Sequence, residues 1–199
     1  MNSGDMSLGW SDDSVPLHTH ACYYYSDEAT LRTGLQFLAA GLSEPGDLLV
    51  MFADKSRFDQ LLGWLQEDSG QATEPLISSG KLAIIGGAPT MDELVGGIGE
   101  RLDEGMAAGY TRIRFLGFIA WGEPNWPDDR TLLEFESKVN EVVMAYPSVI
   151  ICTYGVPTLG GSRLLYGGLQ THPVVWLAGR QVSENPFFTP PTQEPAPLR

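Results

Sequence analysis

The chain has 199 residues, 43% of them apolar, which is enough for one domain with a well-buried core. Twelve basic residues against 25 acidic ones give a net charge of -13, so direct binding to nucleic acid or to an anionic membrane surface is not expected. No apolar run reaches the roughly 18 residues of a membrane span. Two distant cysteines and the lack of a signal segment predict a cytoplasmic protein.

Apolar runs alternate with helical patterns along the chain. In chain order, the sequence predicts a strand at 20–25, a helix at 27–41, a strand at 47–53, a helix at 56–67, a strand at 82–86, a helix at 91–108, a strand at 112–119, a helix at 129–145, a strand at 149–154, a short helix at 162–170 and a strand at 173–178. This alternation predicts an α/β fold of three layers, in which a mainly parallel sheet carries helices on both faces. Ser26-Asp27-Glu28 offers a helix start, and Gly41 is expected to end that helix in the left-handed conformation.

Both ends of the chain differ in composition from its centre. Residues 1–17 are rich in Ser, Asp and Gly without a sustained period, and they are predicted to be a flexible N-terminal segment. Residues 185–199 carry five prolines and are predicted to be a proline-rich tail. The domain itself is expected over residues 18–184.

The loop after the predicted strand 47–53 lacks the glycines of a phosphate-binding loop. Ala53-Asp54-Lys55-Ser56 stands there, whereas G-x-x-x-x-G-K-[ST] needs glycines so that successive backbone N–H groups surround a phosphate chain. The strand at 112–119 carries Phe118 and Ile119 where such an enzyme needs a magnesium-binding acid. The sequence therefore favours sensing or binding over ATP hydrolysis, with no cofactor. An atypical nucleotide site at the helix start of Ser56 is an alternative.

Aromatic side chains gather at or near the carboxyl ends of the predicted strands, where open α/β sheets bind ligands. With neighbouring polar groups they suit a small, mostly apolar organic molecule. The residues expected to bind it are Tyr25, Phe52, Asp54, Ser56, Arg57, Trp121 and Tyr154. The alternative is that the aromatic rings only fill the rim of the core. A filled rim that lacks any cavity near Trp121 and Tyr154 would favour a protein-interaction module that binds no ligand.

Histidines and cysteines offer one arrangement for a metal. His18, His20 and Cys22 alternate, so a strand would project them from one face, and the distant Cys152 and His172 complete a tetrahedral set. No metal is expected, because structural zinc sites usually offer C-x-x-C pairs and this chain has none. Both cysteines are instead predicted to be small buried hydrophobes on core strands. No catalytic residue is expected, since neither cysteine lies at a helix start beside a cation.

The chain also resembles a known family from about residue 20 to residue 191. The resemblance rests on the order and spacing of His20-Ala-Cys22-Tyr-Tyr-Tyr25, Phe37-Leu-Ala-Ala-Gly-Leu42, Gly46-Asp47, Ala108-Gly-Tyr110, Arg114-x-x-Gly117-x-x-x-Trp121, Phe135-Glu136, Val139-Asn140, Ile151-Cys152-Thr-Tyr154, His172-Pro173 and Glu184-Asn-Pro-Phe-Phe-Thr-Pro-Pro191. In these pieces the chain is similar to the MEDS domain, a sensory domain named for methanogen and methylotroph regulators and the dichloromethane regulator.

The resemblance implies a degenerate RecA-like or circadian-clock-ATPase-like fold that senses hydrocarbon derivatives and is not an enzyme. Many relatives are joined to a helix-turn-helix, a histidine kinase or an anti-sigma module, whereas this chain leaves no room for a second domain. The resemblance therefore implies a separate regulatory partner of the kinase, anti-sigma or transcription-factor type, and an oligomer is compatible with it. The family tends to carry an acid directly after the strand glycine, where this chain has Phe118, and this difference favours a more apolar pocket.

Overall fold

A seven-stranded sheet forms the centre of the molecule. The computed structural model describes residues 4–121, 123, 124, 126, 127, 131–177, 180–182 and 185–190. Within these residues the strand order is β5-β4-β6-β7-β3-β8-β9, and every neighbouring pair is parallel except β8 and β9. The strands are β3 (Thr19–Tyr25), β4 (Asp47–Ala53), β5 (Leu82–Gly86), β6 (Arg112–Phe118), β7 (Ser148–Gly155), β8 (Val174–Leu177) and β9 (Arg180–Val182).

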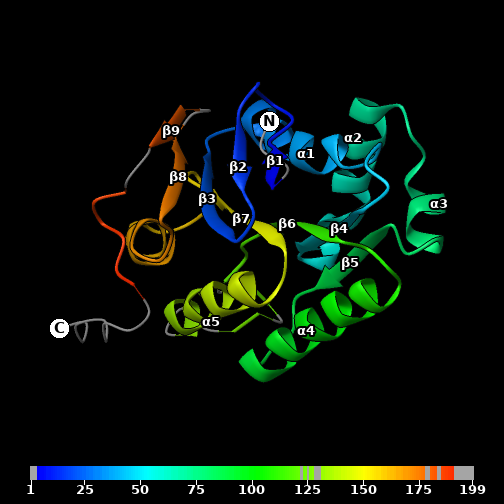
Figure 1. The fold of residues 1–199 in the computed structure, drawn as a ribbon. Helices are drawn as coiled ribbons and strands as arrows, with labels where there is room; N and C mark the ends of the chain where they lie inside the picture. The colour runs from blue at the N-terminus through cyan, green and yellow to red at the C-terminus, as the bar shows by residue number, and fades with distance from the viewer. Residues whose placement is uncertain are drawn as a thin grey trace.

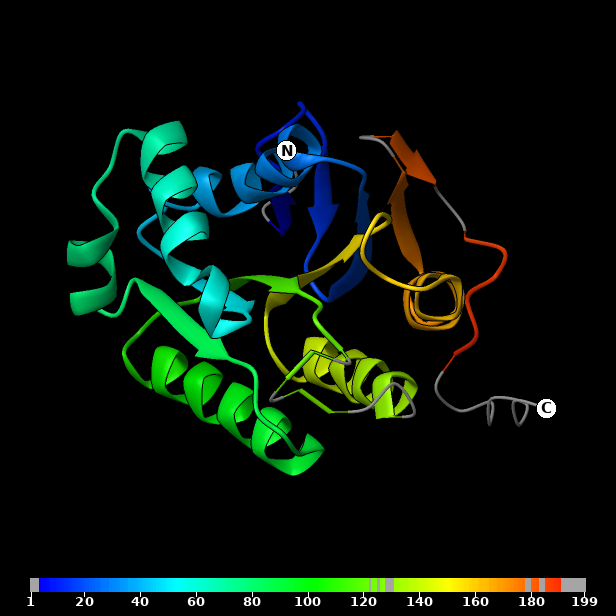
Figure 2. The ribbon, with the colours of Figure 1, turned by 180° about the vertical axis from the view of Figure 1, so that it is seen from behind.

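Helices cover both faces of this sheet (Figures 1 and 2). One face carries α1 (Glu28–Ala40), α2 (Phe58–Ser69) and α3 (Thr73–Ser78), with the short 3-10 turn η1 (Lys55–Arg57) leading into α2. The other face carries α4 (Met91–Ala107), α5 (Leu132–Ala145) and the π-helical segment η3 (Arg163–Leu169). The predicted three-layer α/β fold with a mainly parallel sheet is therefore confirmed.

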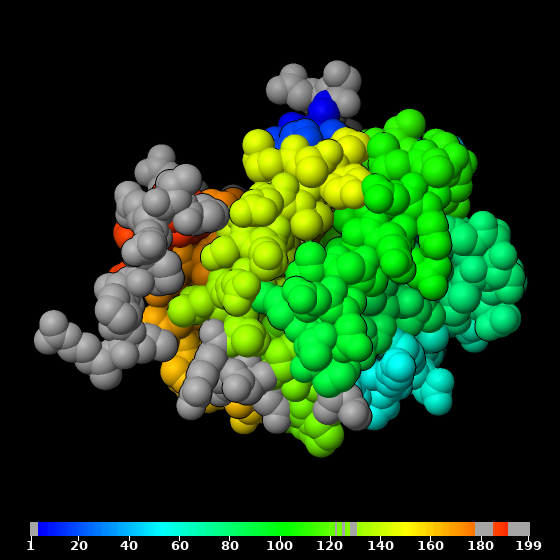
Figure 3. Space-filling model, turned by 90° about the horizontal axis from the view of Figure 1, so that it is seen from below, coloured from blue at the N-terminus to red at the C-terminus, as the bar shows by residue number. Residues whose placement is uncertain are grey.

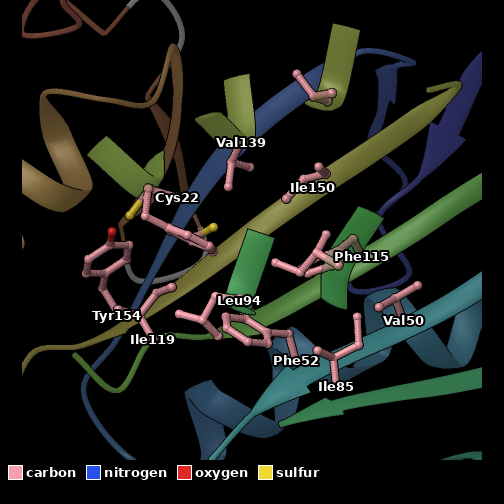
Figure 4. Close-up of a cluster of buried hydrophobic side chains, with 14 of the residues drawn as sticks. Cys22, Val50, Phe52, Ile85, Leu94, Phe115, Ile119, Val139, Ile150 and Tyr154 are labelled. Atoms are coloured by element: carbon pink, nitrogen blue, oxygen red, sulfur yellow. The ribbon is translucent and has the colours of Figure 1, made fainter. Parts of the chain in front are cut away.

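The alternation of side chains along each strand divides the core into two layers. In β4, Leu49 and Met51 pack toward α1 and α2, whereas Val50 and Phe52 pack toward α4 and α5. Figure 4 shows residues of the second layer, with Phe115 and Ile150 of the sheet among side chains of both helices. Figure 3 shows α4 and α5 side by side over this layer.

The predicted strands and helices all occur, and the strands at 47–53 and 82–86 have the predicted bounds. The predicted helix start at 129 and strand end at 178 lie outside the described residues. The predicted helix start at Ser26-Asp27-Glu28 is confirmed, with Asp27 as the residue that caps α1. The short helix α3 and strand β9 were not predicted.

The N-terminal segment differs from the prediction of a flexible chain. β1 (Asp5–Ser7) and β2 (Ser14–Pro16) pair antiparallel, and Met6 and Leu8 are fully buried in the layer that contains α1. Burial of these apolar side chains stabilises a segment whose composition alone suggested disorder. At the other end, Asn185 is buried beside η3, and residues 191–199 of the predicted tail lie outside the described residues.

A buried ion pair between Arg114 and Asp47 links β6 to β4, and further hydrogen bonds of Arg114 link this pair to α1 and the N-terminal hairpin. Arg114 Nε donates to Asp47 Oδ2 at 2.6 Å, and its Nη1 donates to the carbonyl oxygens of Ser7 at 2.6 Å and Phe37 at 3.2 Å. Gly41 ends α1 with φ -83°, so the prediction of a left-handed glycine is wrong. Position 41 requires glycine because the Arg114 side chain packs closely against its backbone. A Cβ at Gly41 would lie 2.5 Å from Arg114 Cδ.

Candidate functional site

An open cleft of about 1020 Å³ lies at the carboxyl ends of the parallel strands. The segments that follow β3, β4, β6 and β7 line it. The chain leaves β3 and β4 for helices on one face of the sheet and leaves β6 and β7 for helices on the other. Because these connections diverge, a crevice opens between them, which is where open α/β sheets bind ligands.

Four of the seven residues predicted to bind a ligand line this cleft. Tyr25 ends β3, and Asp54, Ser56 and Arg57 follow β4. The structure therefore brings together two separate loops that the sequence placed at the same edge of the sheet.

The other three predicted residues, Phe52, Trp121 and Tyr154, lie in the core. Each is 0% exposed, and none lines the cleft. The ring of Trp121 packs against those of Trp126 and Phe135, with centroids 5.2 and 4.6 Å away. Phe52, Trp121 and Tyr154 therefore pack in the core beneath the rim and do not face the cleft.

The apolar wall of the cleft comes from residues that the sequence did not single out. Leu31 of α1 and Trp64 of α2 face Ile119, Ala120 and the segment 157–159. Ile119 and Ala120 directly follow a buried strand, and that position is a signal available in the sequence. The helical residues Leu31 and Trp64 reach the cleft only through the packing of α1 against α2.

Aspartate side chains cap the two helix starts that face the cleft. Asp27 Oδ1 accepts the backbone N–H of Thr30 at 2.8 Å, and Asp54 Oδ1 accepts that of Ser56 at 2.9 Å. The Thr30 N–H lowers the pKa of Asp27, and the Ser56 hydroxyl lowers the pKa of Asp54. Both carboxylates occupy positions where a helix N-terminus would otherwise bind a phosphate. The Ser56 N–H, which the sequence suggested as a contact for a nucleotide, therefore already donates to Asp54.

The described lining of the cleft is negative overall. Four carboxylates oppose two cationic side chains, so a polyphosphate meets net repulsion there. The carboxylates are those of Asp27, Glu28, Asp54 and Glu123, and the cations are Lys55 and Arg57.

A second group of polar side chains lies between the sheet and α5, and none of its members lines the cleft. Nε2 of His20, Oε2 of Glu136, Sγ of Cys152 and Nε2 of His172 approach one another from β3, α5, β7 and the segment before β8. We call these four residues the buried cluster. Burial raises the pKa of the Cys152 thiol well above its usual value and lowers that of His172 well below its own.

The sequence named three members of the buried cluster and missed Glu136. A signal was present, because Glu136 is four residues after Leu132 and three before Val139, on the apolar stripe of α5. Cys22 pairs with Cys152 in register but is not among the four residues. His18 precedes the strand with φ 64°, so the prediction that it shares a strand face with His20 is wrong.

Comparison with known protein families assigns the chain to one of them. The family model described as MEDS, the MEthanogen/methylotroph, DcmR Sensory domain, matches residues 19–173. The chain belongs to the MEDS family of sensory domains. The resemblance inferred from the sequence is therefore confirmed. No curated protein is significantly similar in sequence.

The fold of this MEDS domain also occurs among solved structures. A KaiC-like protein from the hyperthermophilic archaeon Pyrococcus horikoshii OT3 has a TM-score of 0.56 and 18% sequence identity, with 80% of this chain and 70% of that chain covered. The likeness confirms the predicted RecA-like fold, and at this identity it shows the fold alone. Within the described residues of the MEDS domain, no helix is both long and apolar enough to cross a membrane.

Proposed function

We propose that this MEDS domain senses a small organic molecule, uncharged or cationic, in the cleft at the carboxyl ends of the strands. The observation that carries the proposal is the pair of aspartates at the helix starts. Asp27 and Asp54 each accept a hydrogen bond from a backbone N–H at a helix start, and a bound nucleotide would need these N–H groups for its phosphates. The scaffold keeps the ligand-binding edge of its fold but presents carboxylates there instead of anion-binding groups.

The wall of the cleft supports the same class of ligand. Leu31, Trp64, Ile119 and Leu159 offer apolar contacts, and Tyr25 offers a hydroxyl beside them. Pockets with a mainly apolar wall and a few polar groups bind small organic molecules. A hydrocarbon derivative with one hydrogen-bonding or cationic group, such as an alcohol, a haloalkane or an alkylamine, fits this chemistry.

The sensing role requires a change that a partner recognises. The ligand would lie between the starts of α1 and α2 on one side and the segment after β6 on the other. Its binding shifts the population of states that differ in the distance between these two sides of the cleft. A regulatory protein of the kinase, anti-sigma or transcription-factor type in the cytoplasm is the proposed recipient. The domain acts by binding, without converting the ligand.

A thermal-shift screen tests the proposal. Alcohols, haloalkanes and alkylamines are compared with ATP-magnesium and ADP. A ligand at a hundred times its Kd stabilises the native state by about 2.7 kcal/mol. For a chain of this length that is a rise in Tm of roughly 5–10 °C.

Two matched variants locate the response. Ala120→Trp places a large ring in the cleft wall and should abolish stabilisation by the ligand, whereas Ala107→Trp, at an exposed position of α4 outside the cleft, should retain it. An equal response in both variants, or a response only to nucleotides, would refute the proposal.

Exposed apolar side chains of η3 favour a second candidate, a protein-interaction module without a ligand. Leu165 is 55% exposed and Tyr166 is 40% exposed, so both offer contact area for another protein. If no compound in the thermal-shift screen raises the Tm, that result would support this candidate.

A further inference from the structure

Four of the separations within the buried cluster match the edges of a tetrahedral metal site. His20 Nε2 lies 3.4 Å from Glu136 Oε2 and 3.5 Å from Cys152 Sγ, and Glu136 Oε2 lies 3.6 Å from both Cys152 Sγ and His172 Nε2. All four ligand atoms lie within 4.8 Å of one another. Zinc bonds of about 2.0–2.3 Å in a tetrahedron give edges of roughly 3.3–3.8 Å.

The hydrogen bonds of His172 direct a lone pair into the cluster. Its Nδ1 lies 2.7 Å from the carbonyl oxygen of Gly168, which can only accept, so Nδ1 carries the proton. In the neutral ring Nε2 is then an acceptor, and it faces the acceptor oxygen of Glu136. This Nε2 is completely buried and has no hydrogen-bond partner among the described residues. Two buried acceptors that face each other need a proton or a metal ion between them.

The ring of His20 is oriented in the same way by Asn140. Asn140 Nδ2 donates to the carbonyl oxygens of Glu136 at 3.0 Å and Thr171 at 3.1 Å, which fixes the orientation of its amide. Asn140 Oδ1 therefore accepts from Nδ1 of His20 at 3.1 Å, which leaves Nε2 as the ring nitrogen that faces the cluster. Metal-binding histidines characteristically donate their other N–H to an oxygen acceptor in this manner.

Glu136 completes the set from α5. Its side chain is 0% exposed, and its Oε1 accepts the hydroxyl of Tyr154, which leaves Oε2 directed toward the cluster. A carboxylate and a thiolate together balance the charge of a divalent ion, with two neutral imidazoles as the remaining ligands. Two nitrogen ligands, one sulfur and one oxygen suit zinc, whereas magnesium and calcium prefer oxygen alone.

We propose that His20, Glu136, Cys152 and His172 bind a divalent transition-metal ion of the zinc class. Cys152 binds as a thiolate, and its proton passes to solvent as the sulfur–metal bond forms. With four protein ligands and no exposed position, the site is structural: it links β3, β7 and α5 with the segment before β8. The proposal does not depend on the cleft or on its ligand.

Metal content and cobalt substitution test the site in the intact protein. Protein from zinc-supplemented cells, purified without added metal, should carry about one equivalent of ion by mass spectrometry, as closed four-ligand sites do. Replacement by cobalt(II) should give a thiolate-to-cobalt charge-transfer band and the intense visible bands of a tetrahedral ion. A chelator should lower the Tm, because the ion binds only the native state.

Matched variants identify the ligands. Cys22 and Cys152 are register partners, both buried, so their alanine variants lose similar packing. Cys152→Ala should lose the charge-transfer band and most of the metal, whereas Cys22→Ala should keep both. Asn140→Ala removes only a positioning residue and should weaken zinc affinity about 10–100-fold.

Two results would overturn the proposal. Wild-type protein without bound metal that also fails to develop the cobalt bands would show that the buried cluster binds no transition-metal ion. Equal metal content in Cys152→Ala and Cys22→Ala would place the ion elsewhere. If Cys152→Ala does not fold, the cobalt spectrum of the wild-type protein still decides between a thiolate ligand and none.

Discussion

Removal of the Asp54 carboxylate should destabilise the domain by a predictable amount. The carboxylate accepts the N–H of Ser56 at 2.9 Å, its hydroxyl at 2.5 Å and the Nε1–H of Trp126 at 2.9 Å. Loss of a helix cap costs about 0.5–2 kcal/mol, and the buried indole N–H left without a partner costs about 1–3 kcal/mol. We therefore expect Asp54→Ala to lose roughly 2–4 kcal/mol in urea unfolding, and Asp54→Asn, which keeps one of the two acceptor oxygens, to lose about 1–2 kcal/mol.

The pH dependence of the same pair of proteins gives a second readout. Because the folded-state pKa of Asp54 is lowered, its contribution to stability is present above its unfolded pKa and is lost as pH falls through the folded value. The difference between parent and Asp54→Ala should be constant from about pH 5 to 8 and should shrink below about pH 4. Sulfate should also stabilise Asp54→Ala more than the parent, since the Ser56 N–H is freed. A loss under about 0.5 kcal/mol at pH 7, the level of an ordinary surface substitution, would refute this role of Asp54.

Three further substitutions test the packing by urea unfolding. Trp121→Ala should lose about 3–5 kcal/mol with no direct loss of ligand contacts, because the ring is buried away from the cleft; a near-parental stability with weakened ligand binding would reverse that assignment. Asp47→Asn should lose about 3–5 kcal/mol, because it leaves the buried Arg114 without its charge partner, and a change below 1 kcal/mol would speak against the pair. Gly168→Ala should lose about 1–3 kcal/mol, because a Cβ there would collide with the Tyr24 hydroxyl, and unchanged stability would show that the ring moves freely.

The elements of the central sheet could be predicted because their patterns are local. The strand at 47–53 is a continuous apolar run before a helical period, and its bounds agree with β4. The N-terminal hairpin could not be predicted in this way, because Met6 and Leu8 are buried by contacts with distant residues of the α1 layer. Three-residue strands carry too little periodicity to be recognised.

The candidate site also contains residues that the sequence could place and residues that it could not. Tyr25 and Asp54 follow parallel strands, so the topology alone places them at one edge of the sheet. The burial of Tyr154 could have been read from strand parity, since it shares a face of β7 with Cys152. Trp121 lies beyond the end of β6, where no periodicity indicates which way a side chain points. The contact of Glu136 with residues of two distant strands depends on how α5 docks against the sheet.

Amide chemical shifts of the ¹⁵N-labelled protein show directly whether a small organic molecule binds in the cleft. Alcohols, haloalkanes and alkylamines are titrated separately, with ATP-magnesium as the comparison. We expect at least one of these organic classes to cause saturable shifts at Tyr25, Asp54, Arg57 and Ile119, and we expect ATP-magnesium to cause none there. Saturable shifts of the same amides with ATP-magnesium alone would contradict this expectation, and so would organic ligands whose shifts fall only on residues outside the cleft.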